Sequence, residues 1–216
     1  MKPTMLTTIS LLLFASTTYF PLIALSSNEQ LEDINGNPIF YSTHFYIKPS
    51  IFGPAGGGVR LGKTGNSTCP LTVLQDYSEV INGLPVKFTN PGEIFIDLIT
   101  TDELLKGIEF VEKPECGESS KWIVVEDDDF PRPWIGIGGI EDNKDKKIID
   151  GRFKIVKHGF GYKIVFCPRI TAPPGLCFDI GRYSDENGRR LILTEKNPFE
   201  IVFVITDNIG TGGSLV

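Results

Sequence analysis

Short apolar or alternating stretches recur along most of the chain, and Gly, Pro, Asn and Asp separate them. The stretches cover residues 45–47, 86–88, 94–99, 122–125, 153–156, 162–166, 191–193 and 201–205. Runs of this length between turn-forming residues are typical of β-strands. A helix-like pattern occurs only at residues 101–106, which is too short for an architectural helix. The pattern therefore predicts an all-β fold, either a barrel or a sandwich.

The N-terminal pattern differs from the rest of the chain. Lys2 precedes an apolar run at residues 11–14 that continues to Leu25, and the small residues Ala24 and Ser26 suit a cleavage site. These features predict a secretory signal peptide over residues 1–26, and interruptions by Thr and Ser argue against a membrane span. We expect a mature domain of residues 27–216 that is secreted or vacuolar.

Charge and length limit the partners of this domain. The formal net charge of −6 becomes −7 when Lys2 is lost with the leader. A mildly acidic chain is poorly suited to nucleic acid or an anionic membrane surface. The remaining length suits one domain with a sizeable core. We therefore expect a monomer that binds neither nucleic acid nor membranes.

The chain has four cysteines, Cys69, Cys116, Cys167 and Cys177. In a secreted chain they predict two disulfides, for which three pairings exist. Only nine residues separate the last two cysteines, and the Pro-Pro-Gly at 173–175 can turn the chain back. The spacing therefore favours pairing in sequence order.

Two further motifs lie in a glycine-rich region. Asn66 begins the sequon Asn-Ser-Thr, and its place in a turn makes it a candidate glycosylation site. Gly57 to Thr64 match the P-loop expression, but phosphate binding there needs a helix after Thr64. Gly65, Asn66 and then Pro70 follow instead. We interpret these glycines as turns between strands and expect no cofactor.

Catalytic and metal-binding groups are sparse. His44 and His158 are the only histidines, and neither is close in sequence to a recognisable nucleophile or ligand cluster. Disulfide formation would also remove the thiolates. The acidic run at 127–129 lacks the alternation of a calcium loop and is interpreted as a solvated loop. We expect no metal site and no enzyme activity.

Several segments together resemble the plant Kunitz-type (soybean trypsin inhibitor) family. They are Leu-Glu-Asp-Ile-Asn-Gly-Asn-Pro-Ile at 31–39, Phe-Tyr-Ile at 45–47, Cys-Pro-Leu-Thr-Val at 69–73, and later segments at 122–126, 151–153, 162–168, 177–181 and 189–191. The resemblance covers essentially the whole mature chain. It implies a β-trefoil of three similar four-strand units, the disulfides Cys69–Cys116 and Cys167–Cys177, and inhibition of an endopeptidase.

The resemblance also implies a protease-binding loop after the first cysteine. This reactive loop falls at Asn90, Pro91, Gly92, Glu93, Ile94 and Phe95. Such a loop enters the protease cleft in a substrate-like conformation, and Pro91 would lower the ordering cost of binding. Serine proteases are the first candidates for the partner, with cysteine and aspartic proteases as alternatives.

Two positions depart from the inhibitory pattern of the family. Trypsin inhibitors carry Arg or Lys at the specificity position, whereas Glu93 would place like charges together and predicts weak trypsin inhibition. Tyr41 occupies a position where the pattern usually has an Asn that supports the loop backbone. Because a phenol cannot copy the paired donor and acceptor of an amide, Tyr41 predicts a less rigid loop.

Alternatives to inhibition through this loop remain open at the level of sequence. Arg132, between two prolines, and Arg169 could engage a protease from another face, or both could be ordinary solvated arginines with Trp134 covering the core. The chain could also be a non-inhibitory storage or defence protein that keeps the fold. A third alternative is a carbohydrate-binding trefoil, with an exposed Trp134 beside the acidic run at 127–129.

Overall fold

The structure is a computed structural model, and it describes residues 28–53, 55–89, 97–169 and 176–206. These ranges contain fourteen strands and one 3-10 helix, η1 (Glu141–Asn143). The strands are β1 (Phe45–Pro49), β2 (Val59–Gly62), β3 (Thr72–Gln75), β4 (Val86–Phe88), β5 (Leu104–Leu105), β6 (Ile108–Phe110), β7 (Trp122–Glu126), β8 (Trp134–Ile137), β9 (Lys147–Ile149), β10 (Gly151–His158), β11 (Gly161–Pro168), β12 (Phe178–Asp185), β13 (Gly188–Thr194) and β14 (Ile201–Ile205). The all-β prediction is confirmed.

The pattern of residues 101–106 was misleading, because this segment forms no helix. Thr101 and Asp102 form a turn in which Asp102 has a φ of 62°, and Leu104 and Leu105 pair with β10 as β5. A residue in the left-handed region breaks a helix at once. Over the described ranges, no helix is long and apolar enough to span a membrane.

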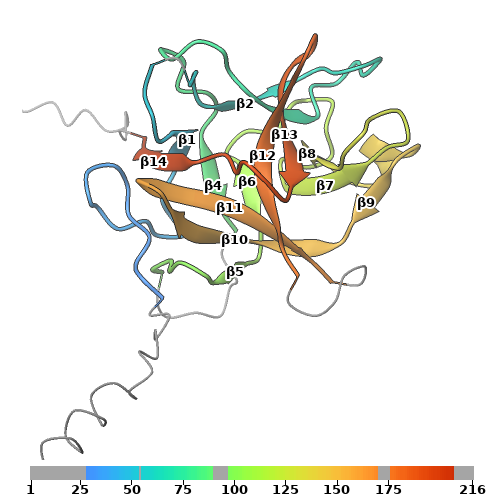
Figure 1. Cartoon of the computed structure of the whole chain (residues 1–216). Coiled ribbons are helices and arrows are strands. Elements are labelled where there is room, and N and C mark those ends of the chain that lie inside the picture. Colours follow the sequence, from blue (N-terminus) through green and yellow to red (C-terminus); the bar gives the residue numbers. More distant parts are fainter. Residues whose placement is uncertain (1–27, 54, 90–96, 170–175, 207–216) are drawn as a thin grey trace, which may run out of the picture.

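All strand pairs are antiparallel and belong to one continuous sheet. Its main path runs β6-β4-β1-β14-β11-β12-β13-β3-β8-β7-β9, with β10 beside β11, β5 beside β10, and β2 beside β3. In Figure 1 the long β10–β11 hairpin crosses the lower half of the molecule, and the β12–β13 hairpin rises to the top. The first and last strands pair directly, from Phe45 opposite Ile205 to Pro49 opposite Ile201.

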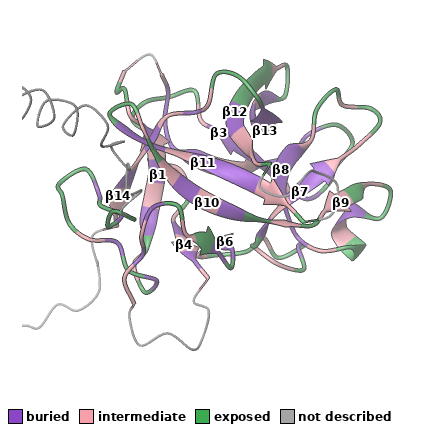
Figure 2. Cartoon of the chain, turned by 60° about the horizontal axis from the view of Figure 1, so that its bottom comes forward, coloured by how far each residue is buried: buried purple, intermediate pink, exposed green. Residues whose placement is uncertain are grey.

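The core lies between the inner faces of these strands (Figure 2). In β1, Phe45 and Ile47 point inward and are fully buried, while Tyr46 and Lys48 are partly exposed. This is the period-two burial expected of a strand with one face on the core. Phe45 packs against Phe88 and Phe203 with ring centroids 4.7 and 5.0 Å apart, so that β1, β4 and β14 share an aromatic cluster.

Candidate functional site

The predicted reactive loop, Asn90 to Phe95, lies outside the described residues, so the structure defines the site by its two stems. The chain enters from Thr89, at the end of β4, and returns at Asp97. On the entering side, the main-chain N–H of Thr89 donates to the carbonyl of Gly107 at 2.9 Å. The Thr89 hydroxyl donates to Glu109 Oε1 at 3.3 Å. These contacts tie the entering stem to β6 and the residue before it.

Gly107 permits this close approach. A Cβ on Gly107 would lie 2.8 Å from the Thr89 hydroxyl oxygen and 2.7 Å from Lys121 Cε. Both separations are shorter than van der Waals contact, so a larger residue would displace the stem or the lysine. No local sequence pattern identifies this glycine, because its role depends on contacts with Thr89 and Lys121, which are distant in sequence.

The returning stem is held by the segment around Tyr41. The Tyr41 N–H donates to the carbonyl of Asp97 at 2.9 Å, and the Ser42 hydroxyl donates to Asp97 Oδ2 at 2.6 Å. Phe40 and Leu98 form an antiparallel bridge next to these bonds. Main-chain hydrogen bonds therefore hold both stems, the entering stem to the residue before β6 and the returning stem to Tyr41.

The side chain of Tyr41 lies in the core rather than at the surface. It is 5% exposed, and its hydroxyl donates to Glu103 Oε1 at 3.0 Å. Glu103 also accepts from the N–H and the hydroxyl of Thr100, at 3.4 and 3.3 Å. Burial raises the pKa of the Tyr41 phenol, and the hydrogen bond and charge of Glu103 raise it further. Tyr41 thus supports the returning stem through its main chain and fixes Glu103 through its side chain.

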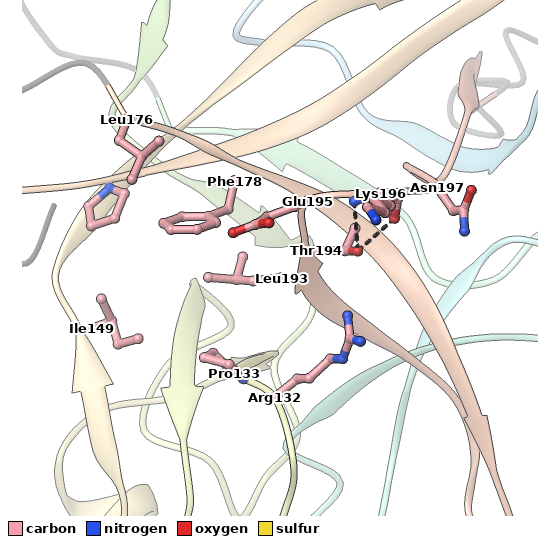
Figure 3. A pocket seen from close by; sticks show the side chains of 11 residues that line it. Arg132, Pro133, Ile149, Leu176, Phe178, Leu193, Thr194, Glu195, Lys196 and Asn197 are labelled. Atoms are coloured by element: carbon pink, nitrogen blue, oxygen red, sulfur yellow. Dashed lines mark hydrogen bonds between the residues drawn. The ribbon is translucent and has the colours of Figure 1, made fainter. Parts of the chain in front are cut away.

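The two alternative arginines, Arg132 and Arg169, lie in different surroundings. Arg169 pairs with Asp150 at 3.2 Å, and both side chains are more than half exposed. Arg132 lies instead at the edge of a cavity of about 710 Å³ (Figure 3). Phe178 and Leu193 form its middle, Ile149 and Leu176 lie at one side, and Arg132 and Lys196 lie at the other; the remaining lining residues are Pro133, Pro168, Thr194, Glu195 and Asn197. The two arginines therefore do not form one site.

Trp134 cannot serve as the exposed aromatic of a carbohydrate site, so that alternative is wrong in its key residue. Trp134 is 3% exposed and packs with Val125, Ile192 and Phe130 in a small second core. Arg190 and Lys146 lie over its ring, 5.8 and 5.0 Å from the centroid. The interpretation of Trp134 as a residue that covers the core is confirmed.

The P-loop-like segment, Gly57 to Thr64, has no helix after it, as expected, because a turn at Gly65 and Asn66 follows Thr64. The interpretation of its glycines as turns needs correction, however. Gly62 belongs to β2, and Gly58 is buried under the backbone of Asn82, whose carbonyl oxygen would clash with an added Cβ. The glycine is required there by close packing of two loops rather than by a turn.

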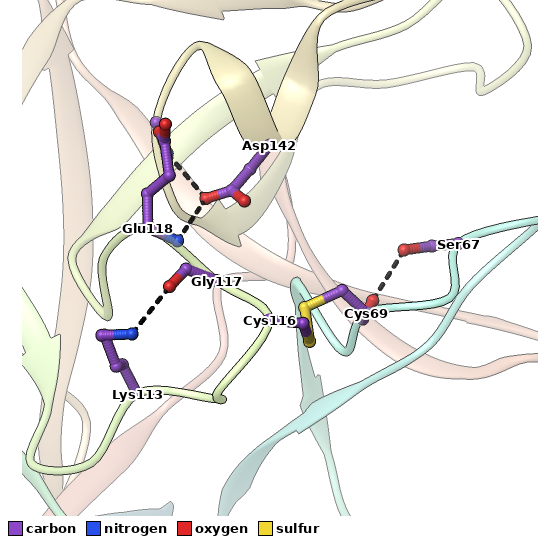
Figure 4. Close-up of a disulfide and its surroundings, with 8 residues drawn as sticks. Ser67, Cys69, Lys113, Cys116, Gly117, Glu118 and Asp142 are labelled. Atoms are coloured by element: carbon purple, nitrogen blue, oxygen red, sulfur yellow. Dashed lines mark hydrogen bonds between the residues drawn. A yellow bond between two sulfur atoms is a disulfide. The ribbon is translucent and has the colours of Figure 1, made fainter.

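Both predicted disulfides, Cys69–Cys116 and Cys167–Cys177, are present. The first joins the segment before β3 to the loop at 113–118, where Lys113 Nζ donates to the Gly117 carbonyl at 2.9 Å (Figure 4). The Ser67 hydroxyl donates to the Cys69 carbonyl at 2.6 Å. Asn66 lies exposed in the turn just before this anchored segment. The sequon is therefore accessible beside a fixed point of the chain.

Metal-binding chemistry finds no support in the described part of the chain. No group of three or more His, Cys, Asp or Glu side chains there could hold a metal ion. The acidic run at 127–129 is a loop in which Asp127 pairs with Lys146 at 3.6 Å.

Comparison of the whole chain with known proteins identifies a family. A family model of the legume Kunitz type, described as trypsin and protease inhibitor, matches residues 31–204. The Kunitz-type trypsin inhibitor-like 1 protein of Pisum sativum is 49% identical over 208 residues, which are 94% of each chain. Subtilisin inhibitor CLSI-II of Canavalia lineata is 51% identical over 176 residues, 80% of this chain and 90% of the relative.

Solved structures of Kunitz-type inhibitors are similar to this chain in fold. A Kunitz-type trypsin inhibitor from Cicer arietinum has 55% identity and a TM-score of 0.76, over 82% of this chain and 99% of that one. Soybean trypsin inhibitor, crystallised in complex with porcine pancreatic trypsin, has 32% identity and a TM-score of 0.69, over 83% of this chain and 100% of that one. These similarities confirm the β-trefoil prediction.

Proposed function

Because the chain belongs to the legume Kunitz family of trypsin and protease inhibitors, we propose that it inhibits a serine endopeptidase through residues Asn90 to Phe95. The supporting observation is that main-chain hydrogen bonds hold both sides of this segment, Thr89 to Gly107 beside β6 and Asp97 to Tyr41. Anchored stems keep the two sides of a scissile bond together after cleavage. Because the cleaved ends would stay in place, hydrolysis of a segment held in this way releases little free energy, and the segment acts as an inhibitor rather than a substrate.

The relatives indicate which class of protease is to be tested. One is named a subtilisin inhibitor, one an elastase inhibitor, and others trypsin inhibitors. With Glu93 at the specificity position, a basic pocket or a pocket tolerant of acidic side chains fits better than the acidic pocket of trypsin. We therefore place subtilisin-like proteases ahead of trypsin as targets.

The test is an inhibition panel with trypsin, elastase and subtilisin. We expect wild type to inhibit subtilisin more strongly than trypsin. Glu93→Arg should improve trypsin inhibition by about 10²-fold or more, because a like-charge contact becomes an opposite-charge pair. The matched control is Glu79→Arg, which makes the same charge change at an exposed glutamate of another loop and should not alter inhibition. No inhibition by wild type and no gain with Glu93→Arg would contradict the proposal and favour a storage role.

We also propose that residues 1–26 direct the chain into the secretory pathway. Both disulfides are of the kind that persists in oxidising compartments, which supports this route. Asn66 would then meet the glycosylation machinery in an exposed turn.

A further inference from the structure

Two arginines from neighbouring strands point at the same two oxygen atoms. Arg182 Nη1, from β12, donates to Gln75 Oε1 at 2.9 Å and to the Ala55 carbonyl at 3.2 Å. Arg189 Nη1, from β13, donates to the Ala55 carbonyl at 2.8 Å and to Gln75 Oε1 at 3.4 Å. Gln75 is fully buried, and its own Nε2 donates to Ala55 and Gly57. The two guanidinium groups are therefore fixed side by side.

Neither arginine has a countercharge within the described residues. The acceptors that they share are a carbonyl and an amide oxygen, and none of the ion pairs found in this part of the chain includes Arg182 or Arg189. Nearby carboxylates are engaged elsewhere, because Asp76 pairs with Arg60 and Asp185 pairs with Arg190. Burial and the positive charge of Arg189 both lower the pKa of Arg182, as expected for adjacent cations without an anion.

The remaining donors of the pair are held in fixed planes. The Arg182 guanidinium lies over the ring of Phe199, and that of Arg189 lies over the ring of Tyr77, each 4.6 Å from the ring centroid. Each guanidinium has five N–H donors, of which the contacts above occupy only those on Nη1. The inner edge of the Arg182 guanidinium is covered by these contacts, but the residue as a whole is exposed, so an ion from solvent can reach it. Two preorganised forks of this kind match the several oxygens of a tetrahedral anion.

We propose that Arg182 and Arg189 form a binding site for a tetrahedral oxyanion, of which inorganic phosphate and sulfate are the simplest examples. A bound anion would screen the repulsion between the two guanidinium groups and link the β12–β13 hairpin more firmly to the loop at Ala55. The hairpin end rises to the top of Figure 1, whereas β5, which follows Glu103 beside the returning stem, lies at the bottom of that view. Anion binding is therefore separate from the proposed protease contact, and neither proposal depends on the other.

The test is the thermal unfolding midpoint of the mature protein in rising concentrations of sodium phosphate or sodium sulfate, with ionic strength held constant by sodium chloride. We expect a saturable rise with each oxyanion, as for any ligand that binds only the native state. Arg182→Gln and Arg189→Gln should each weaken apparent affinity about tenfold or more, which corresponds to the loss of one charge-assisted hydrogen bond. Arg132→Gln removes the same charge at another exposed arginine and should leave affinity within about twofold of wild type.

Because both arginines also hold the loop at Ala55, a second measurement on wild type is needed. Phosphate should shift the side-chain Nε–Hε signals of Arg182 and Arg189 in a nitrogen–proton correlation spectrum, and leave that of Arg132 unchanged. An equal response of the three arginines, a rise in midpoint that never saturates, or an undiminished response in the Gln variants would overturn the proposal. Equal affinity for acetate would contradict its preference for tetrahedral anions.

Discussion

The hydroxyl of Tyr41 offers a direct measure of how firmly the returning stem is built. Tyr41→Phe keeps the buried ring and removes only the donor to Glu103, at 3.0 Å. A hydrogen bond to a charged acceptor contributes about 1.5–3 kcal/mol, and the lower end applies because Glu103 is partly exposed and keeps its contacts with Thr100. We therefore expect the variant to lose about 1.5 kcal/mol of unfolding free energy at pH 7.

The same hydroxyl predicts a dependence on alkaline pH. Burial, followed by the hydrogen bond and charge of Glu103, raises the pKa of Tyr41 above its value in the unfolded chain. Above the unfolded-state pKa of about 10, the unfolded chain releases a proton that the folded protein retains. The stabilising contribution of Tyr41 is thus complete below pH 10 and decreases above it by about 1.4 kcal/mol per pH unit.

Urea unfolding followed by fluorescence of the buried Trp122 and Trp134, at several values between pH 7 and pH 11, would test both statements. The difference in unfolding free energy between wild type and Tyr41→Phe should be constant up to about pH 9 and should vanish near pH 11. Tyr183→Phe, which removes a hydroxyl from an exposed tyrosine, should match wild type at pH 7. A Tyr41→Phe protein as stable as wild type at pH 7, or a difference that does not change with pH, would refute the reasoning.

Two other changes test the stem and the sequon. Gly107→Ala should weaken inhibition of the target protease about tenfold and cost about 1–3 kcal/mol of stability, because its Cβ would lie 2.8 Å from the Thr89 hydroxyl oxygen. Gly117→Ala, where the nearest atom would be 3.4 Å away, is the matched control, and equal inhibition constants for both variants would count against the steric argument. Protein secreted from plant cells should decrease in mass on treatment with peptide N-glycosidase, and Asn66→Gln should abolish that decrease because Asn66 is the exposed acceptor of the sequon. A secreted wild type that does not change in mass would show that the sequon is not used.

The strands that could be predicted from the sequence are those with a clear local signal. β4 and β14 coincide with apolar runs at 86–88 and 201–205, and the runs at 153–156 and 162–166 form the centres of β10 and β11. β12 gave no such signal, because its second half carries exposed polar residues and is held in the sheet by its pairing with β13. Such a segment becomes a strand because it pairs with a neighbouring strand. The alternation of apolar and polar residues along one segment does not reveal which segment it will pair with.

Prediction of the candidate functional site from sequence has the same limit. Cysteine spacing and the family resemblance were sufficient to predict both disulfides, whereas the position of the reactive loop remains a prediction. The roles of Gly107 and of the Tyr41 main chain depend on contacts with Thr89 and Asp97, which are brought together only by the folded sheet. Tyr41 was interpreted as a substitute for a supporting amide, whereas its hydroxyl reaches Glu103, 62 residues further along the chain. No spacing rule connects residues at that separation.

The pairing of β1 with β14 determines when an active inhibitor can first exist during synthesis. Five successive residue pairs join these strands, and the Ile34 N–H also donates to the carbonyl of Phe203, in β14. Contacts between the ends of a chain form late, because they require closure of the largest loop. β14 must therefore leave the ribosome before Phe45 and Ile47 gain their partners Ile205 and Phe203. Until then the nascent chain has the sequence of the family but lacks the closed sheet that β1 and β14 complete.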